Sequence, residues 1–553
     1  MSAEYRRLTE GLPARSAPSA TSFATDSRRV KSWVASLPRA NQMVAHRQLL
    51  DALQDMRSQR LDGVQRLAAL EALRPVVLEA IDLLDGQAQG GSLPLPPPKA
   101  KALAELRAFE EELAFGYRLA VIELCAPAGS VPFLRGGSVA LALERAIFHA
   151  SRLLTRAYFV YDSPREGEWN TLHALFGFAR SVSLEDKAID EVIEEQTLSV
   201  GQIYAQALLL ALSNPYRFSQ REQADLWPAT RDLASYVSLS GKSAGKDSFA
   251  VATDRDQGPG YIPEERTEEH GPLLWLDLDA VRQLLERPLA DGQGGALSLR
   301  LRNGRTLESS VELLRRLRAG WSSAGVRRAS RLAAGHALET VIGLSGLHYR
   351  LAGDVDFETF LQQSGLFGVG GEQDRAGWAP GATEGLRRAS SRAQVLDQSL
   401  NGYRLRWPRE EQVRARVGEI IGIAFGLGEG MDYWMVGSIR WLRHGRDGSV
   451  DAGVSLLARR ADAVAVRAMD GAGVQRPMVR GVQYQPLGSG ERRDMHLLTS
   501  ALFDTLCRRM ELVRGDGPDS ASSAGQALEH YERLTPEEQG GDYVLIQADK
   551  AAA

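Results

Sequence analysis

The residues whose chemistry is easiest to interpret form a short motif in the C-terminal half of the chain. Asp397, Ser399 and Gly402 have the spacing Asp-x-Ser-x-x-Gly, and Arg327 and Arg331 precede them at the spacing Arg-x-x-x-Arg. An arginine fork matches phosphate oxygens and the O6/N7 edge of guanine, and a carboxylate can accept from guanine N–H groups. A serine hydroxyl adds a further bond, and glycine permits a close backbone approach. Together these residue types suit a ligand that carries phosphate and guanine groups.

Short strands are expected to position these residues. Apolar and polar residues alternate after Gly402 up to Trp407, as in a half-buried strand, and Asp-x-Ser-x-x-Gly forms the turn before it. A strand-like run over 333–351 follows the arginine pair. Further strands are predicted at 418–426, 433–442 and 450–457, the last two joined by a hairpin with an Asp-Gly turn. Several short strands with regular turn signals predict a small antiparallel barrel.

The order of these parts is similar to that of PilZ domains. An arginine pair, a strand, the Asp-x-Ser-x-x-Gly motif and a closing strand follow one another within residues 322–460. The resemblance implies a β-barrel that binds cyclic di-GMP. The ligand-binding residues that it implies are Arg327, Arg331, Asp397, Ser399 and Gly402. Additional candidates are Arg328, Arg388, Arg392 and Arg404.

Two features depart from the PilZ pattern. The distance between Arg331 and Asp397 is longer than in compact PilZ domains, which requires residues 352–386 to be an insertion. A competing pair, Arg388 and Arg392, ends just before Asp397 and leaves no room for a strand between the motifs. We therefore prefer Arg327 and Arg331 as the arginine pair.

Each motif also has a purely structural explanation. Arg327 and Arg331 follow a basic helix predicted at 307–321, so they are compatible with a solvated basic face. Asp397 and Ser399 are compatible with a turn that ends a strand, a common use of these residues. On this alternative, the protein is a degenerate PilZ-like scaffold that binds other proteins and no nucleotide.

The rest of the chain predicts a multidomain α+β protein. Low hydrophobicity and several helix breakers predict a disordered arm over 1–26. Helical periodicity over 27–240 predicts an α-helical bundle or solenoid-like domain. A mixed α/β connector that ends in a helix is expected at 241–321. A β-rich C-terminal extension is expected at 461–553, with a helical run at 497–508.

Composition narrows the class of protein. The chain has 553 residues, is 44% hydrophobic and carries a formal net charge of −4, as expected of a soluble multidomain protein. Charge this close to balance gives no electrostatic reason to expect nucleic acid as a partner. No signal peptide or membrane-spanning segment is recognisable, and the two cysteines lie far apart, so we expect a cytoplasmic protein without a disulfide framework.

These observations favour a signalling effector over an enzyme. The sequence has no His-Glu-x-x-His, nucleophile elbow, dinucleotide loop or cysteine cluster, so we expect neither catalysis nor a cofactor or metal. A ligand that engages the arginine segment is expected to fix the connector and reorient the helical half. The output is then contact with another protein, which the resemblance places in motility, secretion or exopolysaccharide machinery. The apolar helix faces are also suited to self-association.

Overall fold

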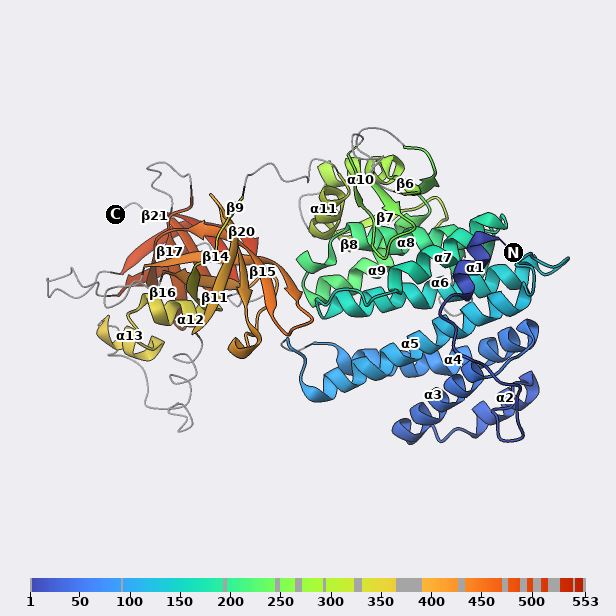
Figure 1. Cartoon of the computed structure of the whole chain (residues 1–553). Helices are drawn as coiled ribbons and strands as arrows, with labels where there is room; N and C mark the ends of the chain where they lie inside the picture. Colours follow the sequence, from blue (N-terminus) through green and yellow to red (C-terminus); the bar gives the residue numbers. More distant parts are fainter. Residues whose placement is uncertain are drawn as a thin grey trace. The chain divides into compact units, whose positions relative to one another are not determined.

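The computed structural model divides into two compact units, with the division between Arg327 and Arg328 (Figure 1). Each unit is described by itself. The described residues are 2–90, 93–191, 196–243, 249–263, 271–291, 295–322, 331–364, 390–425, 433–469, 476–487, 495–500, 509–515, 528–540 and 543–550. These ranges confirm the predicted class, an α-helical N-terminal part followed by antiparallel β-barrels.

The N-terminal unit is built on long helices that bury a common apolar core. They are α2 (Ser27–Ser36), α3 (Gln42–Ser58), α4 (Gly63–Ala88), α5 (Pro97–Leu124), α6 (Gly136–Phe159), α7 (Glu168–Ser181), α8 (Val200–Leu212) and α9 (Gln220–Ala234). The side chain of Asp62 caps α4, and Ser199 and Ser219 form capping boxes that start α8 and α9. The helices α4, α5 and α6 pack side by side (Figure 1).

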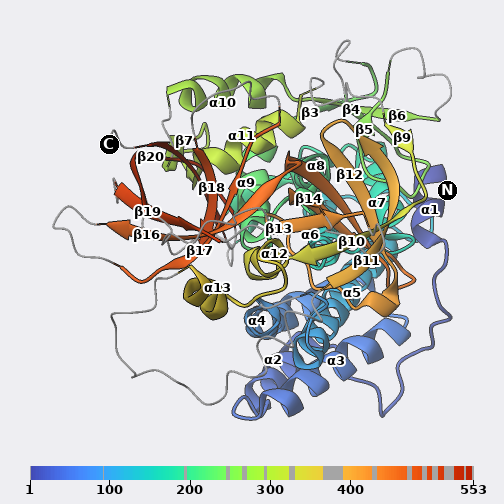
Figure 2. The same cartoon turned by 90° about the vertical axis from the view of Figure 1, so that its left-hand side faces the viewer.

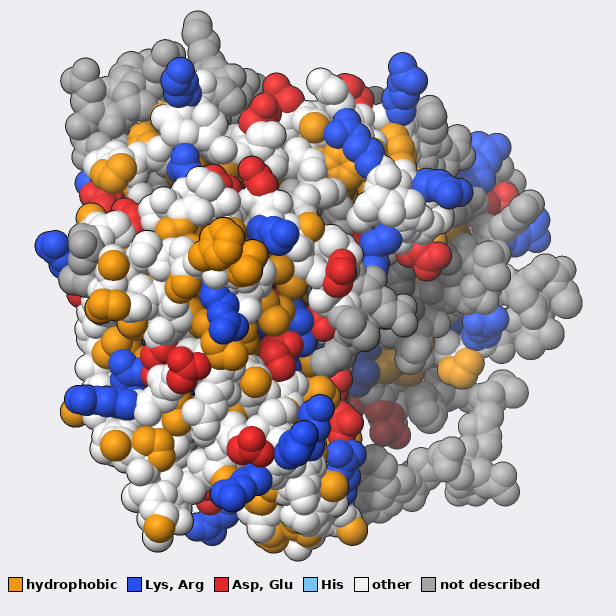
Figure 3. All heavy atoms as spheres, turned by 90° about the vertical axis from the view of Figure 1, so that its right-hand side faces the viewer, with side chains coloured by type: hydrophobic (Ala, Val, Ile, Leu, Met, Phe, Trp, Pro, Cys, Tyr) orange, Lys and Arg blue, Asp and Glu red, His pale blue; other side chains and the backbone are white. Residues whose placement is uncertain are grey.

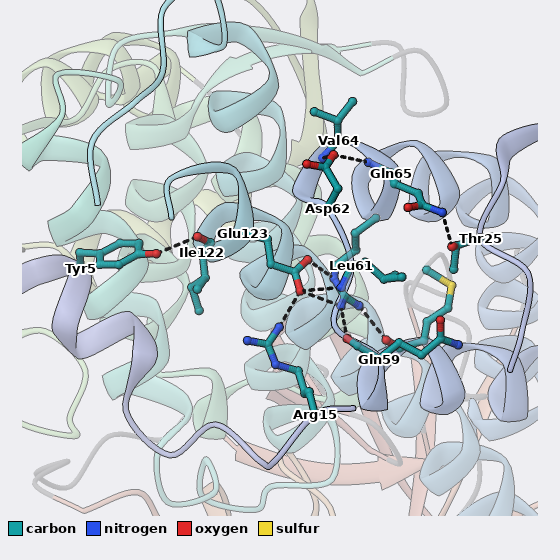
Figure 4. Close-up of polar contacts among 12 residues, drawn as sticks. Tyr5, Arg15, Thr25, Gln59, Leu61, Asp62, Val64, Gln65, Ile122 and Glu123 are labelled. Carbon is teal, nitrogen blue, oxygen red and sulfur yellow. Dashed lines mark hydrogen bonds and ion pairs between the residues drawn. The ribbon is translucent and has the colours of Figure 1, made fainter. Parts of the chain in front are cut away.

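The first residues of the chain are ordered, so the prediction of a disordered arm over 1–26 was wrong. Helix α1 (Ala3–Thr9) buries Tyr5 and Leu8 in the core of the helical domain. The Tyr5 hydroxyl donates to the carbonyl of Ile122 at 2.8 Å, and Arg15 pairs with Glu123 at 2.6 Å (Figure 4). The prediction rested on the low average hydrophobicity of this segment, which does not reveal a few anchoring residues.

A mixed α/β segment completes the N-terminal unit. A hairpin of β1 (Ala188–Glu191) and β2 (Gln196–Ser199) lies within the helical part. Four strands pair in the order β3 (Ser238–Ser240), β6 (Leu273–Asp277), β4 (Phe249–Ala252) and β5 (Gly260–Tyr261). Then come α10 (Asp279–Asp291), the hairpin of β7 (Ala296–Arg300) and β8 (Thr306–Ser310), and α11 (Val311–Gly320). Leu276, Leu285 and Trp321 belong to the same core as the helices, so this segment packs as part of the helical domain.

Charges of both signs lie on one face of the molecule (Figure 3). On the face drawn in Figure 3, Lys and Arg side chains are interspersed with Asp and Glu, and apolar side chains lie between them. Among the described residues, Phe133 and Leu134 are the most exposed large apolar side chains, at 91% and 87% exposure, in the turn between α5 and α6. Within the described ranges, no helix combines the length and the apolar character needed to cross a bilayer.

The C-terminal unit begins with a closed antiparallel barrel. Its strands are β10 (Ala337–Ile342), β11 (Ser390–Ser399), β12 (Gly402–Trp407), β13 (Ile420–Ala424), β14 (Trp434–His444) and β15 (Val450–Ala458). They pair in the order β10-β13-β14-β15-β12-β11, and β11 pairs with β10 to close the ring. A two-residue strand, β9 (Leu332–Ala333), adds to the outer side of this ring beside β11. The predicted barrel is confirmed.

The strand predicted at 333–351 is only partly correct. Strand β10 ends at Ile342, Gly343 adopts a φ of 87°, and residues 344–351 form helix α12 (Leu344–Leu351). Leu344 and Leu347 are one helical turn apart, so the apolar pattern fits a helix face as well as a strand. The predicted insertion at 352–386 contains helix α13 (Phe357–Gln363), and its residues from 365 onward lie outside the described ranges.

A second closed barrel follows the first (Figure 2). Its strands are β16 (Ala461–Met469), β17 (Val479–Tyr484), β18 (Met495–Ser500), β19 (Arg509–Arg514), β20 (Glu529–Gln539) and β21 (Tyr543–Lys550). They pair in the ring order β16-β17-β18-β21-β20-β19. The helix predicted at 497–508 was wrong for its first residues, which belong to β18, and residues 501–508 lie outside the described ranges. There Leu497 faces the barrel interior and Leu498 the outside, an apolar pair that alternation alone does not predict.

Candidate functional site

A β-bulge places Asp397 on the outer face of the first barrel. Val395 pairs with Leu405, both buried in the barrel, and the next pair along the two strands is Asp397 with Arg404. Leu396 is the extra residue. Because side chains alternate between the two faces, an unbroken register would point Asp397 into the core. The bulge instead brings the carboxyl group to the same face as Arg404.

A second bulge places Trp441 on that face. Between β14 and β15 the register shifts at Arg440, so Ile439 pairs with buried Val454 and Trp441 pairs with Gly453. A Cβ atom built at Gly453 would overlap the indole ring. The indole therefore lies directly on the backbone of β15, in space that only glycine leaves open.

The two bulges create a row of cross-strand neighbours, which we name the outer row: Asp397 on β11, Arg404 on β12, Gly453 on β15 and Trp441 on β14. Arg404 is the centre of this row. Its guanidinium carbon lies 5.9 Å from the Trp441 ring centroid, and its Nη1 lies 3.9 Å from Asp397 Oδ2. The row thus joins a carboxylate, a guanidinium fork and an aromatic face.

Arg331 reaches the outer row from outside the ring of strands. It immediately precedes β9, in which Ala333 pairs with Asp397. Its guanidinium forms an ion pair with the Asp397 carboxyl group, and the Arg331 and Asp397 side chains are 28% and 20% exposed. Two motifs that lie 66 residues apart in the sequence thus meet at one carboxylate.

Asp451, an acidic residue that the sequence analysis did not single out, binds Arg404 of the outer row. Asp451 on β15 accepts from Arg404 Nη2 at 2.9 Å and from Arg406 Nε at 2.6 Å. Burial alone would raise the pKa of the Asp451 carboxyl, but the hydrogen bonds from Arg406 and Arg404 outweigh it and lower the pKa. The bond to Asp451 likewise raises the pKa of Arg406. This charged anchor fixes the orientation of Arg404.

Ser399 and Gly402 lie at the hairpin between β11 and β12. They form its closing pair, and the Ser399 hydroxyl donates to the Gly402 carbonyl at 3.4 Å. A Cβ atom at Gly402 would overlap the carbonyl oxygen of Val454 on β15. The close approach expected at this glycine is therefore made by the neighbouring strand.

Two models of one receptor family match this chain in succession. Residues 28–244 match the N-terminal domain of the cyclic-di-GMP receptor FimW, and residues 248–378 and 372–462 match its middle PilZ domain. The chain belongs to the PilZ-domain cyclic-di-GMP receptor family. This PilZ family is one of receptors and not of enzymes.

A curated relative agrees with the PilZ assignment. The cyclic-di-GMP receptor FimW of Pseudomonas aeruginosa is 26% identical over 477 residues, which cover 78% of this chain and 76% of that receptor. No solved structure matches the chain. The PilZ match includes the whole outer row and Arg331, whereas the matched spans end at residue 462, just inside the first strand of the second barrel.

The remaining arginines of the PilZ prediction are separated from the outer row or not described. Arg327, Arg328 and Arg388 lie outside the described residues. Arg392 lies on β11, where its backbone N–H donates to Glu411 at 2.9 Å. It is five residues from Asp397 on the same strand, which corresponds to about 16 Å. Of the additional candidates, Arg404 is the one that the described part of the barrel brings to Asp397.

The sequence analysis missed Trp441, Gly453 and Asp451. Alternation along the strand that contains Ile439 would turn Trp441 inward, and the bulge that turns it outward has no clear sequence signal. Asp451 had a usable signal, because an acidic residue among apolar ones in a strand needs a basic partner on its neighbour. Among the described residues, no group of three or more His, Cys, Asp or Glu side chains is arranged to hold a metal ion.

Proposed function

We propose that this protein is a cyclic-di-GMP-binding effector whose ligand site is the outer face of the first barrel. The observation that carries the proposal is the meeting of Arg331, Asp397 and Arg404 on that face. The family membership supports the choice of ligand, because the matched relative is named as a receptor of cyclic di-GMP.

The residue chemistry suits this ligand. Arg331 and Arg404 each offer a planar fork for a phosphate or for guanine O6 and N7. Asp397 offers a carboxylate for the guanine N1–H and N2–H groups. The exposed part of Trp441 provides a flat surface beside Arg404 on which a purine can stack. Ser399 and Gly402 border the same face, at the end of the hairpin.

The same site offers a route from ligand binding to a changed arrangement of the chain. Arg327 and Arg328 flank the division between the two compact units, and Arg331 follows three residues later. A ligand held by the outer row and by these arginines would fix the junction between the helical domain and the barrels. We propose that the fixed junction alters contacts of the helical domain with a partner protein.

Calorimetric titration with cyclic di-GMP tests the binding proposal. The wild-type protein is expected to bind cyclic di-GMP and to give no heat with GTP. Charge-assisted hydrogen bonds are each worth about 1.5–3 kcal/mol, so Arg331→Ala or Arg404→Ala should weaken binding about ten- to a hundredfold. The matched control is Arg414→Ala, an exposed arginine between β12 and β13, which should bind as wild type.

A double variant tests the choice of arginine pair. Arg327→Ala/Arg331→Ala should abolish the heat of binding, and Arg388→Ala/Arg392→Ala should leave it unchanged. The reverse pattern would assign the site to the second pair. No heat and no thermal shift with cyclic di-GMP would contradict the proposal and favour the protein-binding scaffold.

A further inference from the structure

The second barrel repeats the strand connections of the first. When the strands of each barrel are numbered one to six in chain order, both rings close in the order 1-2-3-6-5-4. In the first barrel this order is β10-β11-β12-β15-β14-β13, and in the second it is β16-β17-β18-β21-β20-β19. Six strands can close into a ring in many orders, so the shared order indicates one architecture used twice.

A β-bulge recurs between the same two strands in both barrels. Between strands five and six, one residue of strand five is skipped. In the first barrel the pairs that flank it are Ile439–Val454 and Trp441–Gly453. In the second barrel they are Pro536–Ile546 and Glu538–Leu545. Because a bulge fixes the local register, it equates Trp441 with Glu538 and Gly453 with Leu545.

The same register defines the equivalent of the outer row. Counted from the hairpin between strands two and three, Asp397–Arg404 is the third pair in the first barrel and Val482–Leu498 is the third in the second. Leu498 pairs in turn with Leu545. The second barrel therefore has three aliphatic side chains where the first has a carboxylate, a guanidinium and a glycine, and these provide no hydrogen bonds to a nucleotide.

This aliphatic surface is buried against the first barrel. Val482 and Leu498 are completely buried and Leu545 is 5% exposed. They form one cluster with Leu344 and Leu347 of α12 and with outward-facing residues of β13 and β14, namely Ile420, Ala424, Trp434 and Val436. Helix α12 contacts β16, β17 and β18 of the second barrel. The interior of the second barrel is a separate cluster that contains Leu497, Val544 and Ile546. The cluster with Leu498 is therefore an interface between the two barrels.

Polar contacts border this interface. The Tyr543 hydroxyl lies 3.2 Å from Ser438 Oγ, and Arg440 binds Glu538 through two bonds of 2.8 and 3.2 Å. Arg440 is the bulge residue next to Trp441 in the first barrel, and Glu538 stands at the position equivalent to Trp441. The bulge that exposes the Trp441 ring in the first barrel thus exposes, in the second, the Glu538 carboxylate, which binds Arg440 of the first barrel.

We propose that the C-terminal barrel is a second copy of the PilZ-type barrel whose ligand-equivalent face has become the docking surface for the first barrel. The chain then has one nucleotide-binding barrel, and the second barrel braces it. The docking surface rests on the contacts above, whereas the single nucleotide site also rests on the proposed function.

Hydrogen exchange in the full-length protein tests the docking surface with two adjacent leucines. Leu498→Ala removes a side chain from the interface, and Leu497→Ala removes one from the interior of the second barrel. Leu498→Ala should speed exchange in β13, β14 and α12 as well as in β18. Leu497→Ala should speed it only in the second barrel. Equal effects of the two variants on the first barrel would overturn the proposal, and Leu498→Met provides a milder change if the alanine variant does not fold.

Calorimetry tests the single nucleotide site. Asp397→Ala/Arg404→Ala should abolish all binding of cyclic di-GMP. Residual binding at reduced stoichiometry would show that the second barrel also binds and would overturn that part of the proposal. If the wild-type protein binds no cyclic di-GMP, the proposed function fails, while the hydrogen-exchange result still decides the docking surface.

Discussion

Gly453 and Trp441 show how single residues shape the candidate site. Any side chain at Gly453 would occupy the space of the indole that lies over it. Gly453→Ala should therefore displace Trp441, lower the free energy of unfolding by about 1–3 kcal/mol and weaken binding of cyclic di-GMP. Urea unfolding and calorimetric titration measure the two effects. Gly335→Ala is the matched control, because a Cβ there meets no atom within 4 Å.

A double variant of Gly453 and Trp441 tests whether the clash with the indole causes the loss of stability. If Gly453→Ala acts through the indole, Trp441→Ala should relieve the overlap, and the double variant should be more stable than the sum of the two single effects predicts. Strict additivity would show that the glycine is needed for another reason.

Glu144 in the helical domain predicts a pH dependence of stability. Burial raises the pKa of its carboxyl group to about 7, a shift that Arg145 and Arg74 oppose and Glu191 reinforces. Between about 4.5 and 7 the folded protein retains a proton that the unfolded chain releases, so the free energy of unfolding falls as pH rises through this window. The loss from this group is about 3 kcal/mol.

Urea unfolding across that window compares two variants. Glu144→Gln stays neutral and should remove this part of the pH slope. Glu79→Gln, whose side chain is 61% exposed, should keep the wild-type slope. A wild-type slope in Glu144→Gln would contradict the assignment.

Among the elements, an ion pair anchors the N-terminal segment to the end of α5. Glu123 at the end of α5 binds Arg15 at 2.6 Å (Figure 4). It also binds Arg66 at 2.6 Å, and the Arg66 side chain is completely buried. Glu123→Gln leaves this buried guanidinium without its counter-charge and should lower the free energy of unfolding by about 3 kcal/mol. The change is measured as a shift of the urea midpoint at constant slope.

An exposed ion pair of the same domain is the control. Arg39 and Glu79 are 3.2 Å apart with side chains that are 58% and 61% exposed, so Glu79→Gln should change stability by less than about 1 kcal/mol. Equal losses in Glu123→Gln and Glu79→Gln would show that burial does not set the strength of these pairs.

The elements also show what the sequence could and could not predict. Helical periodicity and the alternation after Gly402 depend on local spacing, and the helical domain and the first barrel were predicted from them. The bulge at Leu396 lies between β11 and β12, which are joined by a short hairpin, and it depends on the pairing geometry of the two strands, which the alternation of residue types does not reveal. The apolar residues of 344–351 fit the spacing of a helix as well as that of a strand. The helix is formed because Leu344 and Leu347 then pack against the barrels.

For the whole molecule, the division into two compact units predicts two unfolding transitions. Residues 1–327 and 328–553 have separate cores, and the candidate ligand residues of the outer row all lie in the second unit. Cyclic di-GMP at a hundred times its Kd should stabilise the second unit by about 2.7 kcal/mol. Differential scanning calorimetry should show the transition of the second unit moving to higher temperature.

The unfolding transition of the helical unit, residues 1–327, shows whether the ligand also contacts that unit. It should stay in place if the ligand contacts only the barrel unit. A shift of both transitions would indicate that the ligand also stabilises the helical domain, as expected if Arg327 and the barrel hold it together.

The contact between the two barrels has a consequence for symmetry. The first barrel uses helix α12 and the outer face of its strands one, four and five, and the second uses the face of its strands two, three and six. Such a contact is heterologous, because it joins two different faces and has no two-fold axis. The first barrel keeps its own face of strands two, three and six, which is the face of the outer row. The second barrel uses its equivalent face to dock on the first barrel. A further barrel that docked in the same way would need this face of the first barrel, so a bound ligand would block it.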